Sequence, residues 1–381
     1  MAAIYLDNNS TTRAAPEVVD AMGPLWSDVY GNASSLHRAG QRARHAIETA
    51  REQVATLVGA RPRGIVFTSG GTESDNLAIR GVLAACPSKR HVVTTAVEHV
   101  AVHGLCRRFA DQGYGVTFVG VDAGGRLDLD AFGAALTDDT VLASVMHANN
   151  ETGVIFPIGE VAERCAARGV PLHVDAVQSA GKIEIDVRGL GVALASFSAH
   201  KMHGPQGVGA LYVGPGVRMR SQLVGGHQER DLRPGTENVA GIVGFGRAAE
   251  LAQRRLPEMT CVAALRDRLE GGILARIDFA GVNGDRAVRV PNTTNIAFAG
   301  LEAEAVLIAL SEAGVCAASG SACSSGAIEP SHVLAAMGID DRAANGSVRF
   351  SLSHDTTEDE IDRALEIIVA VASRLAALRV S

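Results

Sequence analysis

Short apolar runs alternate with longer amphipathic stretches between about residues 60 and 215 of the 381-residue chain. The runs have the length and the β-branched content of buried strands, and the stretches between them have helical length and spacing. We expect strands at 65–68, 92–95, 116–119, 141–146, 172–175, 193–198 and 209–213, and helices at 73–85, 100–112 and 158–168. Strands that alternate with helices predict an α/β fold with a mostly parallel seven-stranded sheet, covered on both faces.

The pattern changes beyond about residue 255. We expect a helix at 261–277 and short strands near 295–299, 315–317 and 348–351. A long final helix should follow the capping box Thr357-x-x-Glu360. The chain therefore divides into a large α/β domain, residues 15–255, and a smaller α+β domain formed by residues 1–14 and 256–381.

Composition narrows the class of protein. Hydrophobic residues make up 47% of the chain and charged residues 20%, which is ordinary for a globular protein. The net charge of −7 argues against direct nucleic-acid binding over the whole surface. The apolar runs are too short to span a membrane, and the N-terminus does not resemble a signal peptide. The six cysteines show no C-x-x-C spacing, which favours free thiols in a reducing, cytoplasmic compartment.

The segment Thr68-Ser-Gly-Gly-Thr72-Glu73 follows a predicted strand and opens a predicted helix. Its backbone N–H groups and the positive end of the helix dipole could hold a phosphate group. The segment matches neither the dinucleotide fingerprint nor the Walker loop. Taken alone, it fits a glycine-rich turn capped by threonine equally well.

Two charged residues end predicted strands of the same sheet. Asp175 would be costly to bury without a cationic partner such as a ring nitrogen, although a capping role is the simpler interpretation. Lys201 should be poorly solvated, which lowers the pKa of an amine and suits it to bind an aldehyde. A lone lysine here would more often be a surface residue. Together with the phosphate turn, the two residues favour catalysis.

Short segments spread over nearly the whole chain resemble the NifS-type cysteine desulfurases, which are class V aminotransferase-like enzymes that use pyridoxal 5′-phosphate (PLP). The segments are residues 5–12, 68–76, 98–99, 149–153, 175–178, 198–201, 225–230, 233–236 and 319–324. The resemblance implies the PLP-dependent transferase fold of the aspartate aminotransferase type. It also implies conversion of L-cysteine to L-alanine, with delivery of the sulfur to an acceptor protein.

Residue roles follow from the resemblance. Lys201 would bind the cofactor covalently and later move the substrate Cα proton. His99 would stack on the pyridine ring and act as a general acid or base. Asp175 would pair with the ring nitrogen and Gln178 with the phenolic oxygen. Asn150 would lie beside the cofactor and the substrate.

The resemblance also implies how the phosphate and the substrate are held. In a homodimer, Thr236 would reach the phosphate from the other subunit. Arg349 lies in a predicted strand, where alternation lets it point into a cleft and bind the substrate α-carboxylate with two hydrogen bonds. A surface salt bridge is the alternative for this arginine. The remaining phosphate ligands would be Gly71, Thr72, Ser198 and His200.

Cys323 determines the expected reaction. It lies in a tract of small residues, where a cysteine would ordinarily fill a core. Here a flexible tether would let the thiolate attack the substrate sulfur and then present the persulfide to an acceptor. The sequence Ser-Gly-Ser-Ala-Cys resembles the long-loop group of desulfurases.

The sequence departs from the family pattern at three positions, where relatives often have Ala, Ala and Lys. They are Ser10, Gly71 and Gln206, and we expect no effect on the catalytic cycle. The chain ends soon after the predicted final helix, so we expect no C-terminal extension that docks an iron–sulfur scaffold. This favours a specialised acceptor, such as machinery for tRNA thiolation or DNA phosphorothioate modification, and leaves iron–sulfur cluster assembly open.

Other interpretations remain at this stage. The chain could be a selenocysteine lyase or an ordinary class V aminotransferase, or a non-catalytic partner protein with the same fold. A metal site built on His99 and His103, four residues apart on a predicted helix, has no evident third ligand, so we expect no metal.

Overall fold

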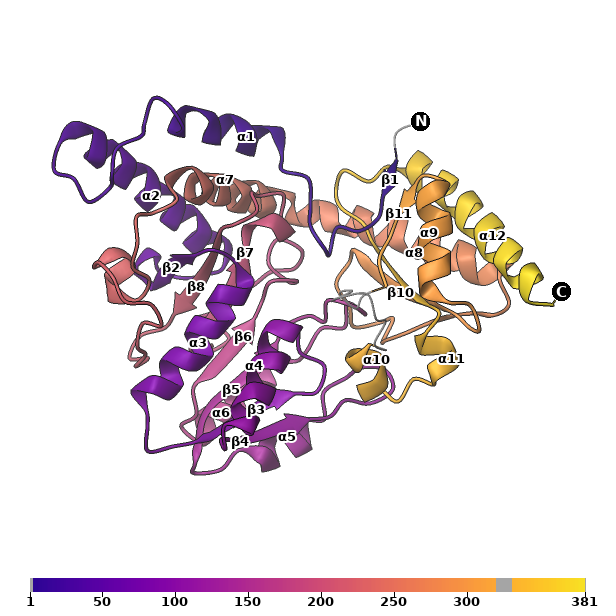
Figure 1. Cartoon of the computed structure of the whole chain (residues 1–381), viewed down its shortest axis with the longest axis horizontal. Coiled ribbons are helices and arrows are strands. Elements are labelled where there is room, and N and C mark those ends of the chain that lie inside the picture. Colours follow the sequence, from indigo (N-terminus) through magenta and orange to yellow (C-terminus); the bar gives the residue numbers. More distant parts are fainter. Residues whose placement is uncertain (1–2, 320–330, 381) are drawn as a thin grey trace.

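The computed structural model describes residues 3–319 and 331–380, and Figure 1 shows how their helices and strands are arranged. The largest sheet has seven strands in the order β2-β8-β7-β6-β5-β3-β4. Four of its six strand pairings are parallel, and the two antiparallel pairings are those of β8 with β2 and with β7. The predicted α/β fold with a mostly parallel sheet is therefore confirmed. The strands are β2 (Ile65–Thr68), β3 (His91–Thr95), β4 (Gly115–Val119), β5 (Thr140–Met146), β6 (Leu172–Asp175), β7 (Leu194–Ser198) and β8 (Gly209–Val213).

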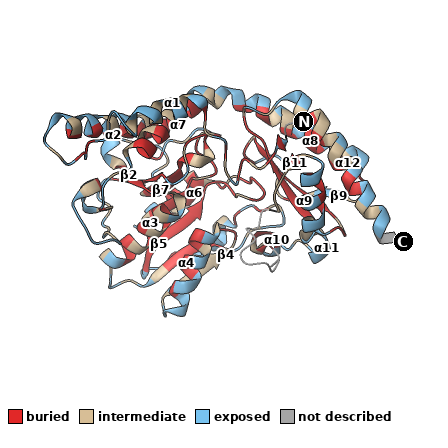
Figure 2. Cartoon of the chain, turned by 45° about the horizontal axis from the view of Figure 1, so that its top comes forward, coloured by how far each residue is buried: buried red, intermediate tan, exposed pale blue. Residues whose placement is uncertain are grey.

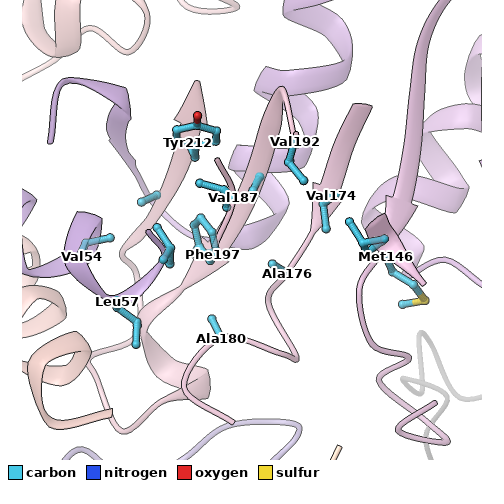
Figure 3. Packing of buried hydrophobic residues seen from close by; sticks show 14 of the residues in the cluster. Val54, Leu57, Met146, Val174, Ala176, Ala180, Val187, Val192, Phe197 and Tyr212 are labelled. Atoms are coloured by element: carbon cyan, nitrogen blue, oxygen red, sulfur yellow. The ribbon is translucent and has the colours of Figure 1, made fainter. Parts of the chain in front are cut away.

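Alternate residues along these strands face two different hydrophobic cores. Val66 packs with helices α3 and α4 on one face of the sheet, whereas Ile65 and Phe67 pack with α2, α5, α6 and α7 on the other. Figure 2 shows the resulting layers, with buried residues along the strands and exposed residues on the outer sides of the helices. Figure 3 shows part of the larger core, to which Val54 of α2 and Phe197 of β7 both belong. The covering helices are α2 (Arg38–Leu57), α3 (Gly71–Ala85), α4 (Val100–Asp111), α5 (Leu129–Ala135), α6 (Ile158–Ala167) and α7 (Val239–Arg255).

A second core surrounds a three-stranded antiparallel sheet in the C-terminal part of the chain, with the strand order β12-β10-β9. The predicted capping box opens its last helix, because the Glu360 N–H donates to Thr357 Oγ1 at 3.2 Å and the Thr357 N–H donates to Glu360 Oε2 at 2.9 Å. The elements are β9 (Ala280–Val282), β10 (Thr293–Phe298), β12 (Ser347–Ser351), α8 (Met259–Arg276), α9 (Ala303–Glu312) and α12 (Glu358–Val380).

The N-terminal segment joins the two cores. Strand β1 (Ile4–Tyr5) pairs in parallel with β11 (Val315–Cys316), beside the small sheet in Figure 1. The chain then crosses to the large sheet, where the Thr12 N–H donates to the His200 carbonyl oxygen at 2.9 Å. Residues 7–12 therefore lie between β12 and the end of β7.

The remaining helices are short. Helix α10 (His332–Ala336) contributes Val333 and Leu334 to the larger core, although it belongs to the C-terminal part of the chain. The others are α1 (Pro16–Met22), α11 (Asp341–Ala344) and the 3₁₀ helices η1 (Gly23–Leu25), η2 (Pro62–Gly64), η3 (Ala199–Lys201), η4 (Gln228–Asp231) and η5 (Leu256–Glu258). Within the described residues, none of the helices has the length and apolar character needed to cross a membrane.

Candidate active site

One pocket lies where strands β5, β6 and β7 end, at Met146, Asp175 and Ser198. Ligands of such sheets bind at the carboxyl ends of the strands, because the loops there diverge and leave a crevice. Nine of the predicted site residues line this pocket. They are Gly71, Thr72, His99, Asn150, Asp175, Gln178, Ser198, His200 and Lys201.

One side of the pocket has free hydrogen-bond donors. Helix α3 begins at Gly71 behind a glycine N-cap, so no capping side chain covers the first backbone N–H groups of the helix. The hydroxyl of Ser198 is buried, and it has no hydrogen-bond partner among the residues that the structure describes. His200 closes this side through a 3.1 Å hydrogen bond between its Nδ1 and Thr11 Oγ1. A phosphate group would satisfy these donors, as at other helix N-termini.

A carboxylate and an imidazole line the pocket at the end of β6 and the start of α4. Burial raises the pKa of Asp175, whose Oδ1 accepts the Val177 N–H at 3.0 Å. His99 is the N-cap of α4, where its Nδ1 accepts the Ala101 N–H at 3.2 Å, and burial lowers its pKa. The histidine is therefore neutral with its proton on Nε2. A basic ring nitrogen in the pocket would supply the cation that a buried Asp175 needs. These residues fit PLP.

Lys201 is the last residue of the 3₁₀ helix η3, which follows directly after β7. Its ammonium group donates to the carbonyl oxygens of Asn9 and Ser10, at 2.6 and 2.8 Å. Burial, followed by the charge of Arg349, lowers the pKa of this amine to about 8. A substantial fraction is therefore neutral near physiological pH, as an amine that attacks an aldehyde must be.

Arg349 lies in β12, between two residues that pack into the small core, Val348 and Phe350. Its Nη1 donates to the Asn150 carbonyl oxygen at 2.8 Å, and its Nη2 donates to Asp7 Oδ1 at 2.8 Å and to Ser10 Oγ at 2.7 Å. The guanidinium is thus directed at the N-terminal segment and at Asn150, which itself lines the pocket.

The structure adds residues that the sequence analysis missed. Asp7 and Ser10 contact Arg349, although Ser10 was expected to have no effect on the cycle. Asn9 is buried and lies at the centre of the network, because its backbone and side-chain oxygens accept from Gln178 and from Lys182. The segment 5–12 was among those that carried the family resemblance, and that was the only signal available for these contacts.

A further acidic residue lines the pocket from α3. Asp75 is fully buried, and burial together with the nearby Asp175 raises its pKa well above the ordinary value. The imidazole of His173 lies beside it, with Nε2 at 3.6 Å from Asp75 Oδ1. Burial lowers the pKa of His173 to about 3, so its imidazole is neutral at neutral pH.

Two clusters of histidines bear on the expectation that the protein binds no metal. The ring of His103 stacks on His332, with centroids 4.6 Å apart. In the described part of the chain, one group of possible ligands lies within 4.8 Å, formed by His203, His354 and Asp355. The guanidinium of Arg255 donates to Nε2 of His354, so that ring nitrogen already has a partner.

Two predicted site residues lie outside this network. Thr236 is exposed on the segment before α7 and does not line the pocket. Cys323 lies outside the described residues.

Comparisons with known proteins show the family to which the chain belongs. The family model of the class-V aminotransferases matches residues 4–364. A cysteine desulfurase of Trichormus azollae is 52% identical over 379 residues, which cover 99% of this chain and 95% of the relative. The cysteine desulfurase NifS of Azotobacter vinelandii is 50% identical over 377 residues, 98% of this chain and 94% of the relative. A solved NifS-like protein superposes with a TM-score of 0.92 at 38% identity, covering 98% of this chain and all of that one (100%).

The chain therefore belongs to the class-V aminotransferase family, whose fold and PLP-type pocket it has. Within that family it is similar over its full length to proteins named cysteine desulfurase and NifS.

Proposed function

We propose that the protein is a PLP-dependent cysteine desulfurase, which converts L-cysteine to L-alanine and transfers the sulfur through Cys323 to an acceptor protein. Its full-length identity to cysteine desulfurases is the observation that carries this proposal. The pocket supports it independently, because it presents an amine of lowered pKa, a buried carboxylate and phosphate-binding donors on one crevice.

The cofactor would be held at both ends. The first N–H groups of α3, at Gly71 and Thr72, and the side chains of Ser198 and His200 would bind its phosphate. Asp175 would pair with the ring nitrogen, and Gln178 would donate to the phenolic oxygen. Bound PLP supplies an electron-withdrawing ring that stabilises negative charge at the substrate α-carbon.

The protein's own groups would then perform the reaction. Arg349 would hold the substrate carboxylate with its planar fork, and Asn150 would contact the substrate beside it. The neutral amine of Lys201 would remove the Cα proton, with His99 as a further acid or base. The Cys323 thiolate would attack the substrate sulfur, forming an S–S bond while the C–S bond breaks. The released electron pair stays with carbon, which is protonated to give alanine.

We also propose a homodimer with two domains in each subunit, residues 15–255 and residues 1–14 with 256–381, located in the cytoplasm. The dimer is supported by two large apolar side chains, Leu223 and Val224, which are exposed beside the segment that carries Thr236. Covering them with a second copy would bury apolar surface. In such a dimer Thr236 would bind the partner's phosphate, as the family resemblance implies. A mass measured by light scattering tests the dimer.

A selenocysteine lyase and an aminotransferase are the alternatives. The purified protein, loaded with PLP, should form alanine and release sulfide in equal amounts when supplied with cysteine and a thiol reductant. A selenocysteine lyase would act on selenocysteine and leave cysteine intact. An aminotransferase would form no sulfide, and its Cys323→Ala variant would keep its activity.

A further inference from the structure

Lysine is rare in this chain, which has only Lys89, Lys182 and Lys201 and otherwise uses arginine as its basic residue. Lys182 is buried in the turn that follows β6, four residues after Gln178. Its ammonium nitrogen donates to Gln178 Oε1 at 2.8 Å and to Asn9 Oδ1 at 3.1 Å. A lysine at this depth is unusual, because charged groups are costly to remove from water.

The surroundings of Lys182 do little to offset that cost. Burial lowers its pKa well below the ordinary value, and the positive charges of Lys201 and Arg349 lower it further. Among the described residues, both of its hydrogen-bond acceptors are neutral amide oxygens. An apolar side chain of similar volume would pack there without this cost. Packing alone therefore does not explain a lysine at this position.

The contacts of Gln178 indicate what the lysine does. Gln178 Oε1 faces the Lys182 nitrogen, while Gln178 Nε2 donates to the Asn9 carbonyl oxygen at 3.0 Å. A flipped amide would direct its oxygen at the Asn9 carbonyl oxygen, which is repulsive, and it would remove the acceptor to which the Lys182 nitrogen now donates. The amide therefore has a single favourable orientation, with one N–H used by Asn9 and the other available.

Asn9 connects this pair to the catalytic lysine. The same Asn9 carbonyl oxygen accepts from Gln178 Nε2 and from Lys201 Nζ, at 3.0 and 2.6 Å. The Asn9 side-chain oxygen accepts from Lys182, and also from Asn292 Nδ2 at 3.0 Å. Lys182 thus contacts both Gln178 and Asn9, which form a short network at the border of the pocket.

We infer that Lys182 is a positioning residue, which orients the Gln178 amide so that its nitrogen, and not its oxygen, is available to the phenolic oxygen of bound PLP. The inference rests on the proposed function, because it concerns how the same site holds its cofactor. Lys182 itself need not touch PLP or the substrate.

A double-mutant cycle tests the inference on the absorption spectrum of the bound cofactor. Lys182→Met, Gln178→Met and the double variant are loaded with PLP, and the pH midpoint of the cofactor absorption band is measured. A hydrogen bond to an anionic oxygen keeps that oxygen ionised, so its loss should move the midpoint upward by about one pH unit in each single variant. The double variant should shift no further than Gln178→Met alone, because Lys182 acts through Gln178.

Additive shifts, or an unchanged midpoint in Lys182→Met, would overturn the inference. Lys89→Met is the matched control, because Lys89 lies away from the pocket, and it should leave the midpoint unchanged. Lys182→Gln, which keeps an N–H donor, should shift the midpoint less than Lys182→Met. If Lys182→Met does not fold, Lys182→Gln combined with Gln178→Met should match Gln178→Met alone. The readout needs no turnover, so a wild-type protein that forms no alanine would refute the proposed function and leave this test intact.

Discussion

The guanidinium of Arg349 donates a 2.8 Å hydrogen bond to the carboxylate of Asp7, which joins the small sheet to the N-terminal segment. A substrate carboxylate that binds this guanidinium must share it with Asp7. The side chain that would recognise cysteine is therefore already ordered by an acidic group of the chain itself.

Replacing Arg349 should weaken cysteine binding and leave the cofactor in place. Arg349→Gln removes the charge and the fork, and KM for cysteine should rise roughly 10- to 100-fold, the usual effect of losing a charge-assisted hydrogen-bonded pair. Arg349→Lys should give an intermediate KM, because it keeps the charge and loses the planar fork. Steady-state kinetics measure both values. A wild-type KM in Arg349→Gln would show that the carboxylate binds elsewhere.

The rate of PLP uptake by the cofactor-free protein should depend on pH through Lys201. Burial lowers the pKa of this amine to about 8, and only the neutral amine attacks the aldehyde. Below pH 8 the uptake rate should therefore fall about tenfold per pH unit, and above it the rate should level off. Arg349→Gln should move the midpoint upward, because it removes a positive charge that opposes protonation. A midpoint near that of an ordinary lysine would contradict this explanation.

Ser198 should contribute to phosphate affinity. Its buried hydroxyl has no hydrogen-bond partner within the described part of the chain, so Ser198→Ala leaves no other group unsatisfied. The Kd for PLP should rise about tenfold, as expected for one hydrogen bond to a charged group. Pyridoxal without the phosphate should bind wild type and variant equally. If the variant loses affinity equally for PLP and for pyridoxal, the substitution has changed the pocket in general and not the phosphate site.

Folding stability should decrease in acid, partly through His173. This imidazole is fully buried between the hydroxyls of Ser144 and Ser196, and its pKa falls from the ordinary 6.5 to about 3. Below pH 6.5 the unfolded chain takes up a proton that the folded protein does not. The stability that the neutral ring contributes is thus present above pH 6.5 and is lost, at up to about 1.4 kcal/mol per pH unit, as the pH falls toward 3.

Urea unfolding of the cofactor-free protein measures this dependence. The His173→Gln variant should be less stable than wild type at neutral pH, but it has no imidazole that can take up a proton. The difference between the two proteins in free energy of unfolding should therefore shrink as the pH falls from 6.5 to 5. His227→Gln, at an exposed position, is the control. If this difference in free energy of unfolding stays constant with pH, His173 is excluded as a source of acid sensitivity.

The large sheet was predictable because its strands are short apolar runs buried on both faces. Strands β2, β6 and β8 begin and end at the predicted residues 65–68, 172–175 and 209–213. Helix α2 was not among the predicted helices, because it packs with small residues such as Ala43 and Ala50 and carries many charged ones. Its place in the fold depends on its packing against α7, which is distant in sequence.

The site was predictable in part for the same reason. Asp175, Ser198 and Lys201 end or follow neighbouring strands, so the topology of a parallel sheet brings them together. The contacts of Asn9 with Lys182 and of Asp7 with Arg349 join residues 173 and 342 positions apart, and local patterns contain no trace of them. The burial of Lys182 could likewise be recognised only in the folded chain. The two-domain division and the roles of all the predicted site residues, including Thr236 and Cys323, stay predictions.

The central claim is that sulfur leaves cysteine through Cys323. The most direct measurement is mass spectrometry of the PLP-loaded protein after brief treatment with cysteine, with peptides mapped under conditions that preserve persulfides and alanine measured in the same sample. One additional sulfur atom on the peptide that contains Cys323, matched by one alanine, is the predicted result, and Cys261→Ser should not change it. Alanine formed by a Cys323→Ala variant, or the extra sulfur on another cysteine, would contradict the account.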